Sequence, residues 1–364
     1  MPTKRCVRCL LPGNYPGVQF NEGRVCSYCL GRQHFGVEAD PQIRSLMARK
    51  ETLRADFERA VAEARGRAEY DCLVPLSGGK DSTYLAHLLK NEYGLKVLTM
   101  TIDTGLLSPL ARPNAARVAA RLNVDHLLYT PKPEFFKKLY RYYLTHPSFE
   151  KTRYEEVGYV STVCQVCCKA IHSMVMQAAA LRRIPFVALA YSPDQIEHHF
   201  YEASHSEVYE QNWAPLPLYE SPFDEEDRRQ FWDPEAFADR RPLPRLLLPF
   251  HVIDYPGAEE VTRKTIELGL LEKRKASLFV TNCRLNWLLM HLDMHKLGYD
   301  PYVASISHQI REGRISRRRW LMLLELERIA ARWGLYRRFW KRREVKEVLA
   351  HLDLSMDELL SQTA

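Results

Sequence analysis

One six-residue motif constrains the fold of this 364-residue chain more than any other feature. The motif, Ser-Gly-Gly-Lys-Asp-Ser at residues 77–82, directly follows an apolar run at 70–76 and precedes a helical stretch at 83–91. A glycine-rich turn between a strand and a helix lets backbone N–H groups approach an anion closely. The order of strand, turn and helix therefore predicts an α/β domain with an anion site at the end of its first strand.

Strand-like and helical stretches continue to alternate after this motif. The apolar runs lie at 96–102, 124–129 and 186–190, and the helical stretches lie at 113–122 and at about 167–183. This spacing predicts a doubly wound parallel sheet. Ligands of such sheets bind at the carboxyl ends of the strands, where residues 77–82 also lie.

The side chains of the motif suit a nucleotide bound with a metal ion. Ser77 and Ser82 offer hydroxyl donors, Lys80 carries a positive charge, and Asp81 suits Mg²⁺ bridging phosphate groups. The alternative is a tight strand-to-helix turn with a polar cap, which has no ligand.

The motif resembles the PP-loop of the ATP pyrophosphatase superfamily, whose domains have a HUP-like α/β fold. The resemblance implies an enzyme that cleaves ATP between the α and β phosphates and adenylates its substrate. It further implies one set of residues for pyrophosphate and another for adenosine. These are Ser77, Gly78, Gly79, Lys80, Asp81 and Ser82 for pyrophosphate, and Thr101, Ile102 and Asp103 for adenosine.

Four of the nine cysteines lie near the N-terminus with metal-ligand spacing. Cys6 and Cys9 form one Cys-x2-Cys pair, and Cys26 and Cys29 form a second pair after a loop of 16 residues. Two such pairs fill the four positions of a tetrahedral zinc ion, which would make the zinc structural. The alternative is four coincidental thiols.

A second group of cysteines lies far from the first in sequence. Cys164, Cys167 and Cys168 come just before the helix expected at about 167–183, and Cys283 begins a later helical stretch. Thiolates bind iron well, and three protein ligands would leave one iron of a [4Fe–4S] cluster open. The alternatives are buried apolar cysteines and a persulfide carrier with a resolving cysteine. The pattern leaves open whether Cys167 or Cys168 is the ligand.

Two further family resemblances point to different reactions. The segment at 6–29 and the segment Ile-Arg-Glu-Gly-Arg-Ile-Ser-Arg at 310–317 look like the ends of N-acetyl sugar amidotransferases. The central Cys-x2-Cys with a later cysteine is similar to the iron–sulfur sulfurtransferases of the tRNA 2-thiolation type. That second resemblance implies that Cys164, Cys167 and Cys283 hold the cluster and take part in catalysis.

Other polar residues are weaker candidates. Asp194 follows the strand expected at 186–190, where it would lie near the magnesium ion, although an Asp in a proline turn explains it equally well. His198, His199 and His205 invite a metal site but fit hydrogen-bonded histidines better. A basic, aromatic segment at 311–346 suits nucleic acid, but more often indicates an amphipathic helix.

Composition and segment character predict five regions. They are a zinc module at 1–33, a linker helix at 34–69, the PP-loop domain at 70–199, an insertion covering the substrate at 200–260, and a helical region at 261–364. No apolar run is long enough for a membrane span, and the N-terminus lacks a signal-peptide pattern, so we expect a cytoplasmic protein. A homodimer is left open.

The sequence thus predicts an ATP-dependent sulfurtransferase that uses ATP, Mg²⁺, Zn²⁺ and a [4Fe–4S] cluster. A nucleobase, nucleotide, tRNA or amino sugar would be the substrate, and a sulfur donor protein the partner. The alternative is an N-acetyl sugar amidotransferase that takes ammonia from a partner glutaminase. A third hypothesis, from a different class, is a non-catalytic module that binds zinc and nucleotide.

Overall fold

The computed structural model describes residues 4–30, 41–146, 158–193, 195–196, 205–211, 223–272, 282–332 and 342–361. The chain divides into two compact units, each assembled from separate segments. Unit 1 contains 1–44, 139–166 and 284–364, and unit 2 contains 45–138 and 167–283. Within the described residues, no helix has the length and apolar character that crossing a membrane would require.

Unit 2 is built on a five-stranded sheet with the order β3-β2-β1-β4-β5. All four strand pairs are parallel, and β1 lies in the middle with Cys72 paired to Val97 on one side and to Phe186 on the other. The strands are β1 (Cys72–Pro75), β2 (Val97–Ile102), β3 (Asp125–Tyr129), β4 (Phe186–Ala188) and β5 (Arg245–Leu247). The predicted parallel α/β sheet is confirmed.

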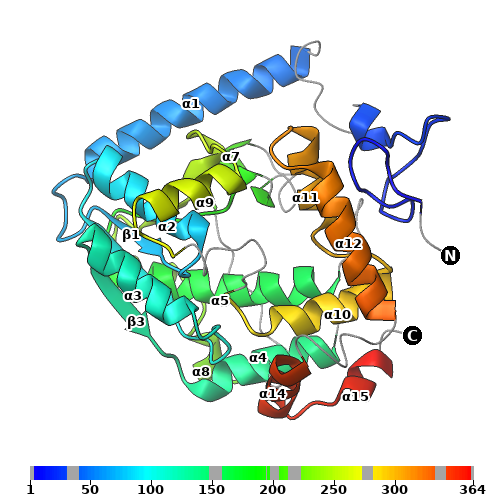
Figure 1. Ribbon diagram of the computed structural model, residues 1–364. Helices are drawn as coiled ribbons and strands as arrows, with labels where there is room; N and C mark the ends of the chain where they lie inside the picture. The colour runs from blue at the N-terminus through cyan, green and yellow to red at the C-terminus, as the bar shows by residue number, and fades with distance from the viewer. Residues whose placement is uncertain are drawn as a thin grey trace. The chain divides into compact units, whose positions relative to one another are not determined.

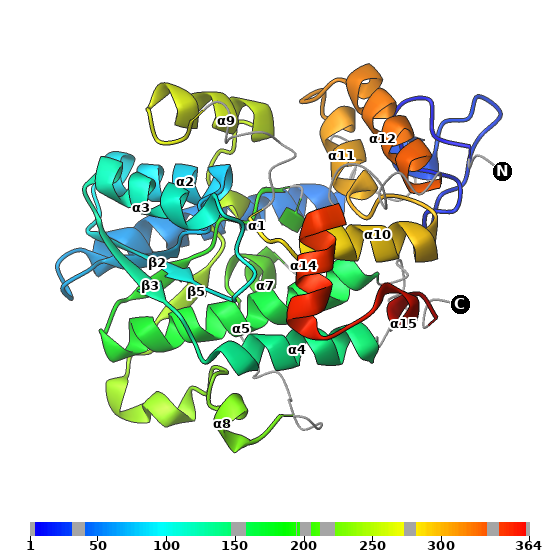
Figure 2. The same cartoon turned by 60° about the horizontal axis from the view of Figure 1, so that its bottom comes forward.

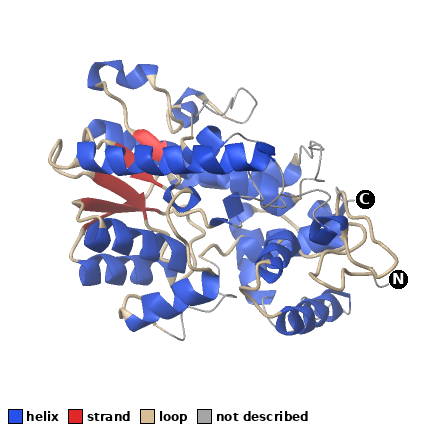
Figure 3. Cartoon of the chain, turned by 90° about the horizontal axis from the view of Figure 1, so that it is seen from above, coloured by secondary structure: helices blue, strands red, loops and turns tan. Residues whose placement is uncertain are grey.

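The sheet is doubly wound because of the direction of its crossovers. The helices α2 (Lys80–His87) and α3 (Ala111–Leu122) connect strands that proceed outward from β1. The chain then returns to the other side of β1, and right-handed crossovers consequently place the next helix on the opposite face. Figure 2 shows α2 and α3 on one face of the sheet and α5 (Tyr159–Leu181) along the other. In Figure 3 the strands lie between helices on both sides.

This winding determines where a ligand can bind. Strand order reverses at β1, so the loop that follows β1 lies at the topological switch point of the sheet. Every residue of β2 is buried, as expected for a strand covered on both faces. The motif at 77–82 is therefore held at the carboxyl edge of a rigid central strand.

The remaining elements of unit 2 surround the sheet. The linker helix predicted at 34–69 is observed as α1 (Pro41–Ala64), and α2 packs beside α9 (Figure 1). Helix α4 crosses from unit 2 into unit 1 at Leu139. The other bounds are η2 (Leu88–Glu92, a π-helical turn), α4 (Pro133–Thr145), α7 (His205–Tyr209), α8 (Glu225–Arg228), η3 (Glu235–Arg240), η4 (Pro249–His251) and α9 (Ala258–Glu267).

The region at 200–260 contributes more than the expected insertion. Its residues Arg245–Leu247 form β5, which pairs with β4 at the edge of the sheet. The strand is very short and is bounded by Pro244 and Pro249, so it gives almost no periodic signal. The expectation that the whole region is an insertion covering the substrate is therefore wrong for Arg245–Leu247, which belong to the central sheet.

Unit 1 is mainly helical. The buried side chains of its cysteine module, including Leu10 and Leu11, form one apolar cluster with Val303, Ile306 and Ile315. The bounds are η1 (Ser27–Leu30), α10 (Asn286–Leu297), α11 (Val303–Arg311), α12 (Arg317–Arg332), α14 (Arg342–Leu352) and α15 (Met356–Ser361). The predicted helical C-terminal region is confirmed over these residues.

Candidate functional site

The glycine-rich loop after β1 has a shape that depends on Gly78. This residue has a φ of +76°, which L-residues with a side chain rarely adopt. A Cβ atom at Gly78 would also lie 2.4 Å from the carbonyl oxygen of Ala111, the first residue of α3. The loop therefore approaches the start of α3 as closely as backbone permits.

Two hydroxyl groups meet inside this loop. The oxygens of Ser77 and Ser82 lie 3.0 Å apart, and the backbone N–H of Ser77 donates to Ser82 Oγ at 3.2 Å. The N–H of Gly79, the N-cap of α2, donates to Ser77 Oγ at 3.4 Å. Ser77 is exposed and Ser82 is buried, so the loop presents one hydroxyl at its surface and is braced by the other.

Asp81 is held from two directions. Lys80 Nζ lies 2.5 Å from Asp81 Oδ2, and the Tyr255 hydroxyl donates to Asp81 Oδ1 at 2.7 Å. The ring of Tyr255 packs edge-on against Phe250 with centroids 5.0 Å apart, and Phe250 in turn stacks on Tyr84 of α2. The carboxylate is therefore oriented at the first turn of α2, where it could serve as an oxygen ligand for Mg²⁺.

A cavity of about 730 Å³ opens at the carboxyl end of β2. Thr101 and Asp103 line it, whereas Ile102 does not and is buried. This split follows from the strand itself, because successive side chains point to opposite faces. Its volume lies within the range of nucleotide-sized ligand sites. The cavity thus lies where the adenosine pocket was predicted, with two of the three predicted residues in its wall.

The wall of this cavity carries paired charges and one orphaned hydroxyl. Arg112 forms an ion pair with the buried carboxylate of Asp103, which also accepts from the N–H of Gly105 at 3.0 Å. Ser108 Oγ is buried and has no hydrogen-bond partner among the residues that the structure describes. A buried polar group without a partner is costly.

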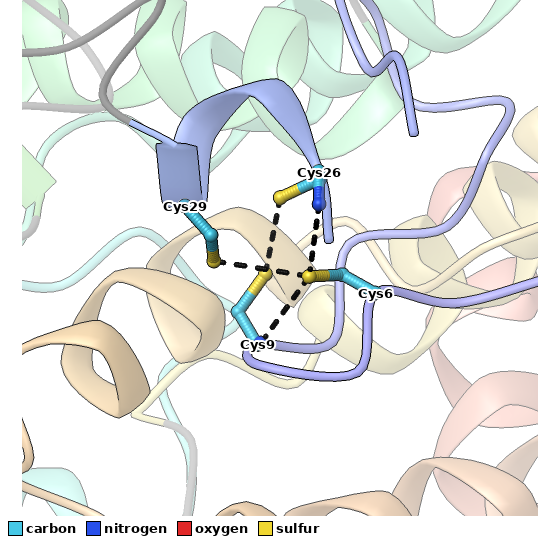
Figure 4. Close-up of side chains that lie close together, drawn as sticks. All are labelled: Cys6, Cys9, Cys26 and Cys29. Atoms are coloured by element: carbon cyan, nitrogen blue, oxygen red, sulfur yellow. Dashed lines mark hydrogen bonds between the residues drawn. The ribbon is translucent and has the colours of Figure 1, made fainter. Parts of the chain in front are cut away.

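The N-terminal cysteines form the tightest group of metal-binding side chains among the described residues. The sulfurs of Cys6, Cys9, Cys26 and Cys29 all lie within 4.8 Å of one another (Figure 4). Cys6 and Cys29 are 3.8 Å apart and Cys9 and Cys26 are 3.6 Å apart, far beyond a disulfide bond. Four sulfurs around zinc, each about 2.3 Å from the ion, would be separated by about 3.8 Å. The quartet fits a tetrahedral ion.

The surroundings of the quartet favour a thiolate at Cys9, whereas hydrogen bonding within the group and burial on balance raise the pKa of the Cys26 and Cys29 thiols. The backbone N–H groups of Cys26 and Cys9 point at Cys6 Sγ at 3.3 and 3.5 Å. Hydrogen bonds from Cys26 and Cys29 lower the pKa of Cys9 well below its usual range. Arg317 closes the module by donating to the carbonyl oxygens of Cys9 at 2.8 Å and Cys6 at 2.9 Å.

The second cysteine group differs from the expectation. Helix α5 begins at Tyr159, so Cys164 and Cys167 lie beyond its first turn and do not open it. The start of the helix is capped instead by the buried Asp293, which accepts from the N–H groups of Tyr159 and Val160 at 2.5 and 2.8 Å. The expectation that these cysteines come just before the helix is therefore wrong, and the N–H groups around them are bonded within the helix.

The separation of three keeps Cys164 and Cys167 on one face of α5. Cys283 comes shortly before α10 and forms an antiparallel β-bridge with Leu107, a residue of the cavity wall. Cys168 is held differently: burial raises the pKa of its thiol, and a hydrogen bond from Tyr191 offsets this in part. Cys164, Cys167 and Cys168 are all half-buried, so the cluster and the choice between Cys167 and Cys168 stay predictions.

Several predicted candidates lie outside the described residues. These are Asp194, His198 and His199, together with the side chain of His205. Conversely, the sequence analysis missed Tyr255 and Asn282 near the loop. Asn282 Nδ2 donates to Ser77 Oγ at 3.3 Å, across 205 positions of sequence. The only available signal was the position of Asn282 directly before Cys283.

Comparison with known proteins supports the fold. Residues 52–178, less than half of the chain, match the family model described as asparagine synthase. This segment holds the glycine-rich loop and the strands β1, β2 and β3. The resemblance of the motif at 77–82 to the PP-loop ATP pyrophosphatase superfamily is confirmed over this segment. A search of curated proteins gave no match.

Solved structures show distant similarity. The U34-tRNA thiolase NcsA from Methanococcus maripaludis, solved with its [4Fe–4S] cluster, is 15% identical, with 89% of each chain covered and a TM-score of 0.34. The NH3-dependent NAD synthetase from Campylobacter jejuni is 14% identical, with 74% of this chain and 94% of that chain covered and a TM-score of 0.30.

The NMN synthetase from Francisella tularensis is 15% identical, with a TM-score of 0.28. The match covers 42% of this chain and 56% of the NMN synthetase. At these scores none of the three structures identifies a substrate or a reaction.

Proposed function

We propose that this protein is an ATP-dependent adenylating enzyme that releases AMP and pyrophosphate. The observation that carries the proposal is the pairing of the loop at 77–82 with the cavity beyond β2, both in unit 2. A glycine-rich loop at the start of a helix, beside a nucleotide-sized cavity, suits a triphosphate better than a small anion.

Each group has a defined task in the adenylation step. A carbonyl oxygen of the substrate attacks the α-phosphorus of ATP, and the bond from that phosphorus to the bridging oxygen breaks. The electron pair leaves with pyrophosphate. Ser77, Ser82 and the backbone of Gly78 and Gly79 would bind the departing phosphates. Asp81 would hold Mg²⁺ when the ion is bound, and Tyr255 orients Asp81.

Sulfur transfer is the second step that we favour. Sulfide attacks the adenylated carbon, the carbon–oxygen bond breaks, and AMP leaves with the electron pair. Cys164 and Cys167 share one face of α5, and Cys283 is tied to the cavity wall through Leu107. Their thiolates suit iron, and we assign the [4Fe–4S] cluster to these three cysteines. When bound, such a cluster with an open iron supplies the sulfur atom.

Amidotransfer is a second candidate, and one observation favours it. The two segments that resemble N-acetyl sugar amidotransferases belong to one body in unit 1. Arg317 binds the carbonyl oxygens of Cys6 and Cys9, and Ser307 Oγ accepts from the N–H of Leu10 at 3.2 Å. Ammonia from a partner glutaminase would then replace sulfide as the nucleophile.

Anaerobically purified full-length protein tests both steps. We would measure iron and sulfide, then follow AMP and pyrophosphate from Mg-ATP with bulk tRNA plus sulfide and with nucleotide-linked N-acetyl sugars plus ammonium. The sulfur proposal expects brown protein that loses iron in Cys164→Ser and Cys283→Ser, with turnover in the sulfide arm. Iron-free protein active only with ammonium would establish amidotransfer. Release of ADP and phosphate would contradict adenylation altogether.

A further inference from the structure

Asn282 reaches the glycine-rich loop from a distant part of unit 2. Its Nδ2 atom lies 3.3 Å from Ser77 Oγ. A Cβ atom at Gly79 would come within 2.5 Å of the same nitrogen, so the amide rests directly against the loop backbone. The Asn282 side chain therefore lies beside the Ser77 hydroxyl and the backbone of Gly79.

The backbone of Asn282 is fixed by the cavity wall. The N–H of Ser108 donates to the carbonyl oxygen of Asn282 at 2.9 Å, and the next residue, Cys283, forms its β-bridge with Leu107. Both Leu107 and Ser108 line the cavity beyond β2. The backbone contacts between residues 282–283 and residues 107–108 thus hold the Asn282 amide at the loop and connect its segment to the cavity wall.

We propose that Asn282 binds a phosphate oxygen of the pyrophosphate group held by the loop. The inference deepens the proposed function and rests on it. A side-chain amide has two N–H donors, and the contact with Ser77 uses one of them. The second donor can serve an anion at the mouth of the loop. The phosphate contact and the thiol of Cys283 then belong to consecutive residues of one segment.

A purely structural role for Asn282 makes a different prediction from a phosphate contact. The carboxylate of Asn282→Asp can still accept a hydrogen bond from the Ser77 hydroxyl, so it would preserve a structural contact. The same carboxylate would repel a phosphate oxygen. The Asp variant should therefore be mild if Asn282 only braces the loop and severe if it binds the anion.

Titration calorimetry with inorganic pyrophosphate and Mg²⁺ on the full-length protein tests the proposal. Asn282→Ala should weaken binding about tenfold or more, as expected for losing a hydrogen bond to a charged group. Asn282→Asp should weaken it further. Asn286→Ala is the matched control, because Asn286 in unit 1 accepts instead from the Tyr302 hydroxyl at 2.7 Å. The Asn286→Ala protein should bind pyrophosphate with the affinity of wild type.

The outcomes separate this inference from the proposed function. Folded Asn282→Ala with wild-type affinity, or Asn282→Asp binding as well as wild type, would overturn the role of Asn282 alone. Wild-type protein that binds neither pyrophosphate nor ATP would overturn the proposed function and this inference together. Thermal unfolding of each variant establishes that the comparison is made on folded protein.

Discussion

The glycine-rich loop of unit 2 and the cysteine quartet of unit 1 are both short irregular segments that gather ligand atoms, but they do so by different means. The loop is shaped by its own backbone, through the positive φ of Gly78 and the close approach to Ala111. The quartet gathers four sulfurs whose mutual repulsion as thiolates needs a cation. One chain thus contains a loop that its backbone shapes in advance and a cysteine group suited to a metal ion.

Replacing half of the quartet should have the largest effect. We expect Cys26→Ser/Cys29→Ser to lose about one zinc ion per chain and to destabilise unit 1, because structural zinc binding is worth about 10–16 kcal/mol in small modules. Metal analysis and thermal unfolding measure both effects. Cys168→Ser is the control, because Cys168 lies outside the quartet, and this variant should retain the zinc ion of the quartet. Full zinc content in the double variant would rule out the site.

Asp81→Ala should abolish pyrophosphate release from ATP without unfolding the protein. Charged groups that stabilise such a reaction are commonly worth about 10²–10³ in rate. The exposed Asp254, next to Tyr255, forms only a surface ion pair with Arg54 and provides the control Asp254→Ala. Turnover near wild type in Asp81→Ala would mean that the loop does not carry the reaction.

Tyr255→Phe should have a smaller effect on the same loop. The variant keeps the ring against Phe250 but removes the hydroxyl that donates to Asp81, so we expect about tenfold weaker binding of Mg-pyrophosphate. Tyr93→Phe is the control, since its ring packs on Phe57 away from the loop. Equal affinity in both variants would leave Tyr255 as a packing residue only.

Replacing Asp293 should have the smallest effect, and this effect should appear only in the pH dependence of stability. Burial raises the pKa of this carboxyl to about 6, although two backbone N–H groups oppose the shift. The folded protein then binds the Asp293 proton more tightly than the unfolded chain does. The contribution of this carboxyl to the free energy of unfolding is therefore largest below about pH 4 and is lost as pH rises through 6. Asn cannot titrate, and Asp293→Asn should remove up to about 1.4 kcal/mol of this dependence per pH unit.

Urea unfolding at several pH values between 4 and 7 measures the Asp293 contribution. Asp300→Asn is the control, since Asp300 is also buried but accepts from the N–H of Tyr302 at 2.7 Å instead. An unchanged pH dependence in Asp293→Asn would show that the carboxyl does not titrate in this range.

Local sequence signals predicted the parts of the molecule that are built locally. The loop at 77–82 and the cysteine quartet can each be recognised from a short stretch of sequence, because glycines and cysteines at such spacing are typical of anion and metal sites. The same Cys-x2-Cys spacing at Cys164 and Cys167 did not show where the pair lies in its helix, since residue type alone does not distinguish a turn from a helix interior. Tyr255 meets Asp81 across 174 positions, and no short pattern contains that contact.

The division of the chain into segments has a consequence for the order of folding during synthesis. All of unit 2 has left the ribosome once Cys283 and a tunnel's length of chain have been made. Unit 1 must wait longer, because Leu10 near its beginning packs with Val303 and Ile306, which are translated almost three hundred residues later. The cysteines at 6–29 are thus synthesised long before the residues that enclose them, which makes the timing of their enclosure a property of the chain's connectivity.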